Sequence, residues 1–196
     1  KLIQNIFMKK NIISKIEDAQ KSLNIFKSSI CVEQIDSAAK LCIQSIKKGG
    51  KILFCGNGGS ASDAAHLSAE LVGRYLKNRK PYASVCLASN LSAITAIAND
   101  FGYENIFSRQ LDSIGSKHDV LFAISTSGIS KNVLKAIKLA HGKKIKVIYL
   151  NSIKNKKKNN YINIDIKVPA QRVDRIQELH ILIGHLICEI IENKIR

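Results

Sequence analysis

Two side chains that can exchange protons stand four positions apart in the stretch FCGNGGSASDAAHLSAE, which runs from Phe54 to Glu70. They are His66 and Glu70, and in a helix this spacing places both on one face. An imidazole and a carboxylate can together move protons between carbon and oxygen near neutral pH. An isolated pair of this kind is more often a surface ion pair on an amphipathic helix, with Asp63 at the rim. Other residues of the chain are needed to distinguish a proton-transfer pair from a surface ion pair.

A turn rich in glycine, Gly56 to Ser60, comes directly before this pair. Glycines let backbone N–H groups approach an anion closely, and the start of the following helix adds partial positive charge. The dinucleotide fingerprint fails because residue 61 is alanine, and the Walker A lysine is absent. The turn is therefore either purely structural or a cradle for a polar substrate.

The segment STSGIS offers a second candidate cradle at the end of another apolar run. Its four hydroxyls belong to Ser125, Thr126, Ser127 and Ser130. Hydroxyls and backbone N–H groups at a helix start can donate to phosphate oxygens without any cation. A helix cap requires only one such hydroxyl. The surplus favours a phosphate site over an ordinary cap.

The last apolar stretch of the chain carries further polar residues on a predicted helix. They are Asp174, Gln177, Glu178, His180 and His185. Gln177 and His185 share one stripe, Glu178 and His185 also share a face, and His180 adjoins Gln177. A lone histidine among apolar neighbours is usually a satisfied core residue. Spacing alone does not choose among these pairs.

The elements that position these residues alternate between apolar strands and helices, which predicts an α/β fold with a parallel sheet covered on both faces. Ligands in such sheets lie beyond the C-terminal strand ends, so the turns after residues 55 and 124 form the expected functional edge. We expect an N-terminal extension over 1–10, a helical segment over 11–50 and one α/β domain over 51–196. The expected strands are 51–56, 84–89, 119–126, 146–150 and an edge strand at 161–168. The expected helices are two within 11–48, followed by 60–77, 91–98, 130–141 and 171–193.

Composition restricts the class of protein. A net charge of +16 suggests nucleic acid as a possible partner, but most lysines are scattered along the chain. The densest run, KNKKKNN, is expected to be a solvated loop. The five cysteines are spread without a C-x-x-C motif, which predicts reduced thiols in a cytoplasmic protein. No membrane-spanning run and no secretory signal is evident, and we assign no function to the residues before Met8.

Four stretches then occur in order that resemble a known family: CGNGGSASDAAHLSAELVGRY, ANDFGYENIFSRQL, ISTSGIS and VPAQRVDRIQELHILIGHLICEIIE. Together they resemble the sugar isomerase (SIS) family and, within it, the phosphoheptose isomerases. The resemblance covers about residues 10–193. It implies a single SIS domain with a five-stranded parallel sheet between helices, a flavodoxin-like three-layer sandwich.

The resemblance also implies roles for particular residues. It implies one zinc ion per subunit held by His66, Glu70, Gln177 and His185, with Glu70 as the base at carbon and His185 as its acid/base partner. It implies that the substrate phosphate lies on Ser125, Thr126, Ser127 and Ser130. It implies that the remaining sugar contacts come from Asn57, Gly58, Gly59, Glu70, Asn99, Asp100, Asp174 and Gln177. Ile129 departs from the polar residue that is common in the family.

The implied activity is an aldose–ketose isomerisation through an enediol, from sedoheptulose 7-phosphate to D-glycero-D-manno-heptose 7-phosphate. That reaction begins nucleotide-activated heptose synthesis for lipopolysaccharide core or capsule. The family assembles as homotetramers, so residues 11–48 are expected to pack on other copies. The competing interpretation is a non-catalytic SIS-fold protein that senses phosphosugars or binds a replication initiator. Neither nucleic acid nor a membrane is an expected partner.

Overall fold

Five parallel strands form the central sheet in the order β2-β1-β3-β4-β5. The computed structural model describes residues 2–195, and side chains from residue 8 onwards. The strands are β1 (Ile52–Cys55), β2 (Ser84–Cys86), β3 (Val120–Ile124), β4 (Lys146–Ser152) and β5 (Ile164–Val168). Every residue of β1 and β3 is buried, as their unbroken apolar runs predict. The predicted α/β fold is confirmed, and so is the edge position of the last strand.

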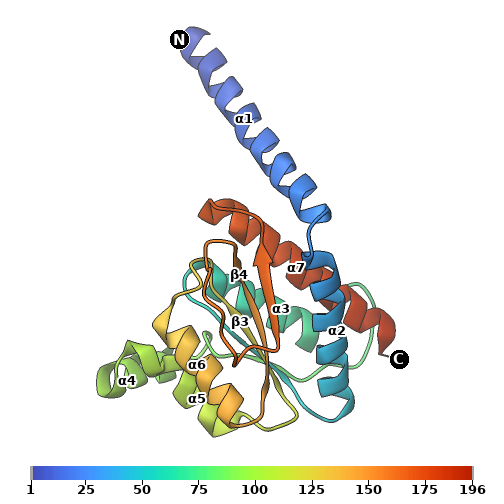
Figure 1. Ribbon diagram of the computed structural model, residues 1–196, viewed down its shortest axis with the longest axis vertical. Helices are drawn as coiled ribbons and strands as arrows, with labels where there is room; N and C mark the ends of the chain where they lie inside the picture. The colour runs from blue at the N-terminus through green and yellow to red at the C-terminus, as the bar shows by residue number, and fades with distance from the viewer. Residues whose placement is uncertain (1, 196) are drawn as a thin grey trace.

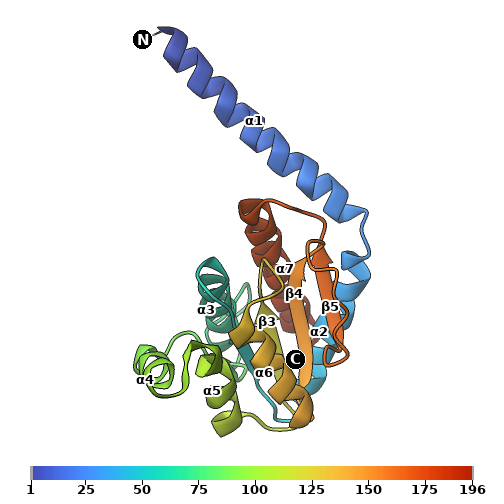
Figure 2. The same cartoon turned by 60° about the vertical axis from the view of Figure 1, so that its left-hand side comes forward.

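Helices cover both faces of this sheet (Figures 1 and 2). They are α1 (Leu2–Lys27), α2 (Cys31–Lys47), α3 (Gly59–Val72), α4 (Leu91–Phe101), the short 3-10 helix η1 (Tyr103–Asn105), α5 (Ile106–Ile114), α6 (Lys131–Gly142) and α7 (Val173–Lys194). One hydrophobic core lies between the sheet and α2, α3 and α7, and a second between the sheet and α5 and α6. The result is the predicted three-layer sandwich. The expectation that residues 11–48 pack largely on other copies is therefore wrong for α2, whose buried residues belong to this chain's own core.

The strand order reverses direction between β1 and β3. The chain leaves β1 toward β2 on one side and then returns to place β3 on the other side of β1. In parallel sheets, this switch point opens a crevice at the C-terminal strand ends. The turns after β1 and β3 flank it. The glycine turn, Gly56 to Ser60, and the serine loop, Ser125 to Ser130, are therefore neighbours.

The largest differences from the expected elements are in two parts of the chain. The third helix ends at Val72 rather than at residue 77, and Gly73 follows it. Residues 103–114, for which no element was expected, form η1 and α5. Only three buried residues mark α5, namely Ile106, Phe107 and Leu111, which is too few to show a helical period.

The first helix projects from the body of the molecule (Figures 1 and 2), and its C-terminal half contacts the start of α7 through hydrogen bonds from Arg172 to Asp18 and from Arg175 to the backbone oxygen of Lys15. It runs without a break from Leu2 to Lys27, so the expected extension and the first helical segment are one element; Lys1 lies outside the described residues. Large apolar side chains on it are exposed, namely Met8, Ile12, Ile13, Ile16, Leu23 and Ile25. Among the described residues, no helix combines the length and apolar character that crossing a membrane requires.

Candidate active site and metal centre

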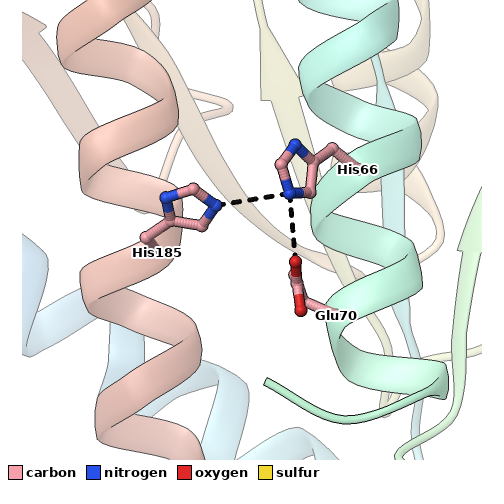
Figure 3. Close-up of side chains that lie close together, drawn as sticks. All are labelled: His66, Glu70 and His185. Atoms are coloured by element: carbon pink, nitrogen blue, oxygen red, sulfur yellow. Dashed lines mark hydrogen bonds and ion pairs between the residues drawn. The ribbon is translucent and has the colours of Figure 1, made fainter. Parts of the chain in front are cut away.

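Three side chains from two helices meet at one point (Figure 3). On α3, Nε2 of His66 lies 3.0 Å from Oε1 of Glu70. On α7, Nε2 of His185 lies 3.4 Å from Nε2 of His66. The candidate ligand atoms of all three residues lie within 4.8 Å of one another. The His66–Glu70 pair is therefore not an isolated surface ion pair, because a histidine from the far end of the chain joins it.

Close packing of α3 on α7 brings these side chains together. Gly184 precedes His185, and a Cβ at this glycine would collide with the side chain of Leu67, the residue after His66. The absence of a side chain at position 184 lets the two helices approach directly beside the two histidines. The neighbouring core residues Leu67 and Ile183 are fully buried and anchor the contact.

Tyr75 and Asp63 add to this cluster. The Tyr75 ring stacks on the His185 ring, with centroids 5.5 Å apart and planes 22° apart. Asp63 lies one turn before His66, and its buried Oδ2 forms no hydrogen bond with the described residues. Burial raises the pKa of this carboxyl to about 6, although the neighbouring His66 opposes the rise. Sequence reasoning placed Tyr75 inside the expected helix 60–77 and assigned it no role, because no local pattern reveals its contact with a histidine on α7.

Gln177 does not join the three residues in this structure. Its amide lies against Gly59 at the start of α3, at a place where a Cβ on Gly59 would collide with it. No hydrogen bond among the described residues links Gln177 to His66, Glu70 or His185. The predicted ligand set thus has three gathered members, and the fourth remains a prediction. The absence of a side chain at Gly59 leaves room for the amide in this position.

The serine loop after β3 gathers its hydroxyls. The Oγ of buried Ser125 lies 3.1 Å from Oγ of Ser130 and 3.5 Å from Oγ of Ser127. Ser130 precedes α6 without a side-chain cap bond to that helix. Its hydroxyl is therefore not needed for capping and remains near the helix start, where an anion is favoured. Thr126 lies in the same loop, and the side chain of Ile129 is exposed.

Asn57 ties the glycine turn to the serine loop's helix. Its side chain donates to Asn132 Oδ1 at 2.9 Å, and Asn132 donates back to Asn57 Oδ1 at 2.8 Å. The Tyr103 hydroxyl also donates to Asn57 Oδ1, at 3.1 Å. Gly58 and Gly59 follow at the start of α3. The two predicted cradles thus belong to one site, and Asn132 and Tyr103 are members that sequence reasoning did not assign.

Three predicted substrate contacts lie outside this cluster. The side chain of Asn99 donates to that of Asp100 at 2.8 Å, and both are exposed at the end of α4. Asp174 begins α7, where hydrogen bonds from Arg172 lower the pKa of its carboxyl. No contact among the described residues joins these three to His66, Glu70 or His185, so their roles remain predictions.

The other polar residues of α7 have structural partners. His180 is fully buried, and its Nε2 lies 3.1 Å from the backbone oxygen of Asn151. Glu178 accepts a hydrogen bond from Arg175 at 2.6 Å. Of the histidines on this helix, only His185 reaches α3, which resolves the alternatives that spacing left open.

The gathered donors fit a zinc ion. Zinc takes imidazole nitrogen and carboxylate oxygen at about 2.0–2.2 Å, so two ligand atoms of one tetrahedral ion lie about 3.4 Å apart. Two of the three separations within the cluster, 3.0 Å and 3.4 Å, are close to that value, and the third is within 4.8 Å. Glu70 and His185 are only partly exposed, and His66 faces solvent. The donor set and its spacing are therefore suited to zinc.

The chain is similar to known proteins over most of its length. The family model for the SIS domain matches residues 16–152. The phosphoheptose isomerase of Helicobacter hepaticus is 51% identical over 160 residues, which are 82% of each chain. That of Helicobacter pylori is 44% identical over 192 residues, 98% of this chain and 97% of its own. The solved structure of phosphoheptose isomerase from Neisseria gonorrhoeae superposes with a TM-score of 0.87 at 37% identity, covering 95% of this chain and 99% of that one.

The Helicobacter pylori and Neisseria gonorrhoeae proteins are matched over almost their whole length. The fold, the cluster and the comparisons together show that the chain belongs to the phosphoheptose isomerase family of SIS-domain proteins.

Proposed function

We propose that this chain isomerises sedoheptulose 7-phosphate to D-glycero-D-manno-heptose 7-phosphate, the first step toward nucleotide-activated heptose for lipopolysaccharide core or capsule. The observation that carries the proposal is the meeting of Glu70 and His185 from α3 and α7. A ketose–aldose conversion needs a base at carbon and a proton carrier at the oxygens, and these residue types supply both.

The free atoms of the two residues suit these roles. Glu70 uses Oε1 toward His66, while Oε2 forms no hydrogen bond with the described residues. His185 uses Nε2 toward His66, and its Nδ1 is likewise free of described partners. Glu70 Oε2 removes the proton from one carbon and returns it to the next. His185 moves the proton between the two oxygens, so the enediol forms and collapses without net change in charge.

The residues His66, Glu70 and His185 would hold a zinc ion, with Gln177 as the fourth ligand after its side chain turns away from Gly59. Zinc would supply Lewis-acid polarisation of the sugar carbonyl. Within the chain itself, His66 orients Glu70 by its 3.0 Å contact. The amide of Gln177 also lies beside the glycine turn, where the sugar hydroxyls would bind.

The serine loop would bind the phosphate at the other end of the substrate. Ser125, Ser127 and Ser130 direct hydroxyls toward one another at the start of α6, where the helix dipole favours an anion. The Asn57–Asn132 pair holds this loop's helix against the glycine turn. A rigid separation of the phosphate site from the proton-transfer groups would select sugar phosphates of suitable chain length.

Assembly and location complete the proposal. The exposed apolar residues of α1 would be covered in a homotetramer, and neighbouring subunits would bring Asn99, Asp100 and Asp174 to the site. We expect a cytoplasmic enzyme whose partner is the sugar phosphate rather than nucleic acid or a membrane. A non-catalytic phosphosugar sensor or initiator-binding protein is not favoured, because such a protein has no need of the gathered proton-transfer residues.

Incubation of the purified chain with sedoheptulose 7-phosphate tests the proposal, with the aldose phosphate followed by NMR. Sedoheptulose without phosphate is the matched control substrate. We expect conversion of the phosphate ester and little conversion of the free sugar. Failure to convert the ester in the presence of zinc would contradict the proposed function.

A further inference from the structure

A buried carboxylate on α7, remote from the reacting groups, holds the loop that follows α3. Glu192 has a side chain only 2% exposed. Its Oε2 accepts hydrogen bonds from the backbone N–H groups of Leu76 and Lys77, both at 2.8 Å, and its Oε1 accepts one from that of Tyr75 at 3.2 Å. Burial alone raises the pKa of such a carboxyl, but these donors and the charge of Arg79 outweigh it and lower the pKa.

Arg79 connects the same carboxylate to the end of α3. Its Nε donates to Glu192 Oε1 at 3.0 Å, Nη2 donates to the backbone oxygen of Glu70 at 2.8 Å, and Nη1 donates to that of Leu71 at 2.9 Å. These are among the last carbonyls of α3, which have no partner within the helix. One guanidinium, 10% exposed, therefore joins the helix that carries Glu70 to the helix that carries His185.

Tyr75 transmits this arrangement to the cluster. Its backbone is fixed by Glu192, and its ring stacks on the ring of His185 at 5.5 Å. The stack restricts rotation of the imidazole about its terminal side-chain torsion, which is otherwise broad. In this orientation, Nε2 of His185 faces His66.

We propose that Arg79, Glu192 and Tyr75 form a positioning clamp that sets the separation of α3 from α7 and the ring plane of His185. None of the three is among the ligand and acid/base residues, so the clamp acts through His185 and Glu70. The inference rests on the proposed function of those two residues. Partners of metal ligands of this kind typically change metal affinity or activity 10–100-fold when they are replaced.

A matched buried carboxylate provides the control. Asp119 directly precedes the central strand β3 and has a fully buried side chain, and it accepts hydrogen bonds from the N–H groups of Lys51 and Ser116 and from the Lys51 ammonium. Glu192→Gln and Asp119→Asn thus remove equivalent buried charges. A purely structural role for Glu192 predicts the same outcome for both variants.

Zinc titration by calorimetry, together with kinetics, separates these possibilities. We expect Glu192→Gln to weaken zinc binding and lower kcat by ~10-fold or more, with KM changed less than twofold because the serine loop is untouched. Tyr75→Leu should do the same on an intact fold, Tyr75→Phe should restore wild-type behaviour, and Asp119→Asn should leave zinc affinity unchanged. Wild-type zinc affinity in both Glu192→Gln and Tyr75→Leu would contradict the proposed clamp. A loss of zinc affinity in Asp119→Asn equal to that in Glu192→Gln would contradict it as well.

A second readout uses neither zinc nor turnover. In metal-free protein, the ring-current shift of Tyr75 on the His185 imidazole protons is visible by NMR. Glu192→Gln should move these His185 signals toward their positions in Tyr75→Leu, and unmoved signals would overturn the clamp. If the wild type neither binds zinc nor isomerises the sugar phosphate, the proposed function fails, while this comparison still decides the clamp.

Discussion

The Nε2 atoms of His66 and His185 lie 3.4 Å apart although 119 positions separate the two residues in the chain. The contact depends on two helices that pack on the same face of the sheet and approach each other beside a glycine. It turns a common surface pair, His66 and Glu70, into a three-residue cluster that fits a metal ion and proton transfer.

Enlarging the glycine at the helix contact should open the cluster. In Gly184→Ala, the new methyl group meets Leu67, and we expect a loss of about 1–3 kcal/mol of folding free energy from overpacking. Zinc affinity should fall as well, because α7 moves away from α3. Gly142→Ala in α6 is the control, since nothing lies within 4 Å of a Cβ there. Chemical denaturation and zinc titration measure both effects, and equal results for the two variants would contradict the role of the close approach.

Loss of one hydroxyl from the serine loop should weaken substrate binding without harming the helix. In Ser130→Ala, one hydrogen bond to a charged phosphate is lost, which corresponds to about 1.5–3 kcal/mol and a rise in KM of roughly 10–100-fold. The fold should be unaffected because Ser130 forms no side-chain cap bond. Steady-state kinetics check the value. Ser113→Ala, an exposed hydroxyl on α5, should behave as wild type, and an unchanged KM in Ser130→Ala would argue against phosphate binding at this loop.

Buried His180 should make folding sensitive to acid. Burial lowers the pKa of its imidazole to about 4, partly opposed by the Asn151 carbonyl, against an ordinary value of 6.5. The unfolded chain therefore binds this proton first, so the stabilisation is complete above pH 6.5 and is lost as the pH falls toward 4. The loss approaches about 3 kcal/mol. Urea denaturation of wild type and His180→Gln across this range measures it, with His141→Gln as control; an equal pH slope in His180→Gln would refute the assignment.

Most of the fold could be predicted from the sequence, because five apolar runs alternate with helical patterns and each run occupies a central or an edge strand as expected. The spacing of His66 and Glu70 and the hydroxyl-rich loop also located two parts of the site. The spacing on α7 left Glu178, His180 and His185 as alternatives, since all three are compatible with an inward-facing position. Only packing against α3 distinguished His185.

Other members of the site depend on contacts that no local pattern reveals. Asn132 pairs with Asn57 across 75 positions of the chain. The Glu192 carboxylate accepts a hydrogen bond from the backbone N–H of Leu76 across 116 positions. Neither asparagine nor glutamate on an amphipathic helix indicates by itself that its side chain is buried. The third helix ends early for a related reason, because Arg79 binds its last carbonyls from the following loop.

A charge among the exposed apolar residues of α1 should break the proposed tetramer. Ile12 is 60% exposed, and burial of Glu at this position between subunits would be unfavourable. We expect Ile12→Glu to lower the mass of the assembly measured by light scattering at micromolar concentration. Lys10→Glu introduces the same group at an exposed polar position of the helix and should leave the mass unchanged. A wild-type chain that is monomeric under these conditions would contradict the assembly.

The rate of Glu70→Gln with sedoheptulose 7-phosphate tests the central claim most directly, because this substitution keeps the size of the side chain and removes the base. Glu33→Gln, on the exposed side of α2, controls for loss of a carboxylate elsewhere. We expect Glu70→Gln to remain folded with kcat lower by about 10²–10⁴-fold, and we expect Glu33→Gln to keep the wild-type rate. A folded Glu70→Gln protein that forms the aldose phosphate as fast as the wild type would contradict the account.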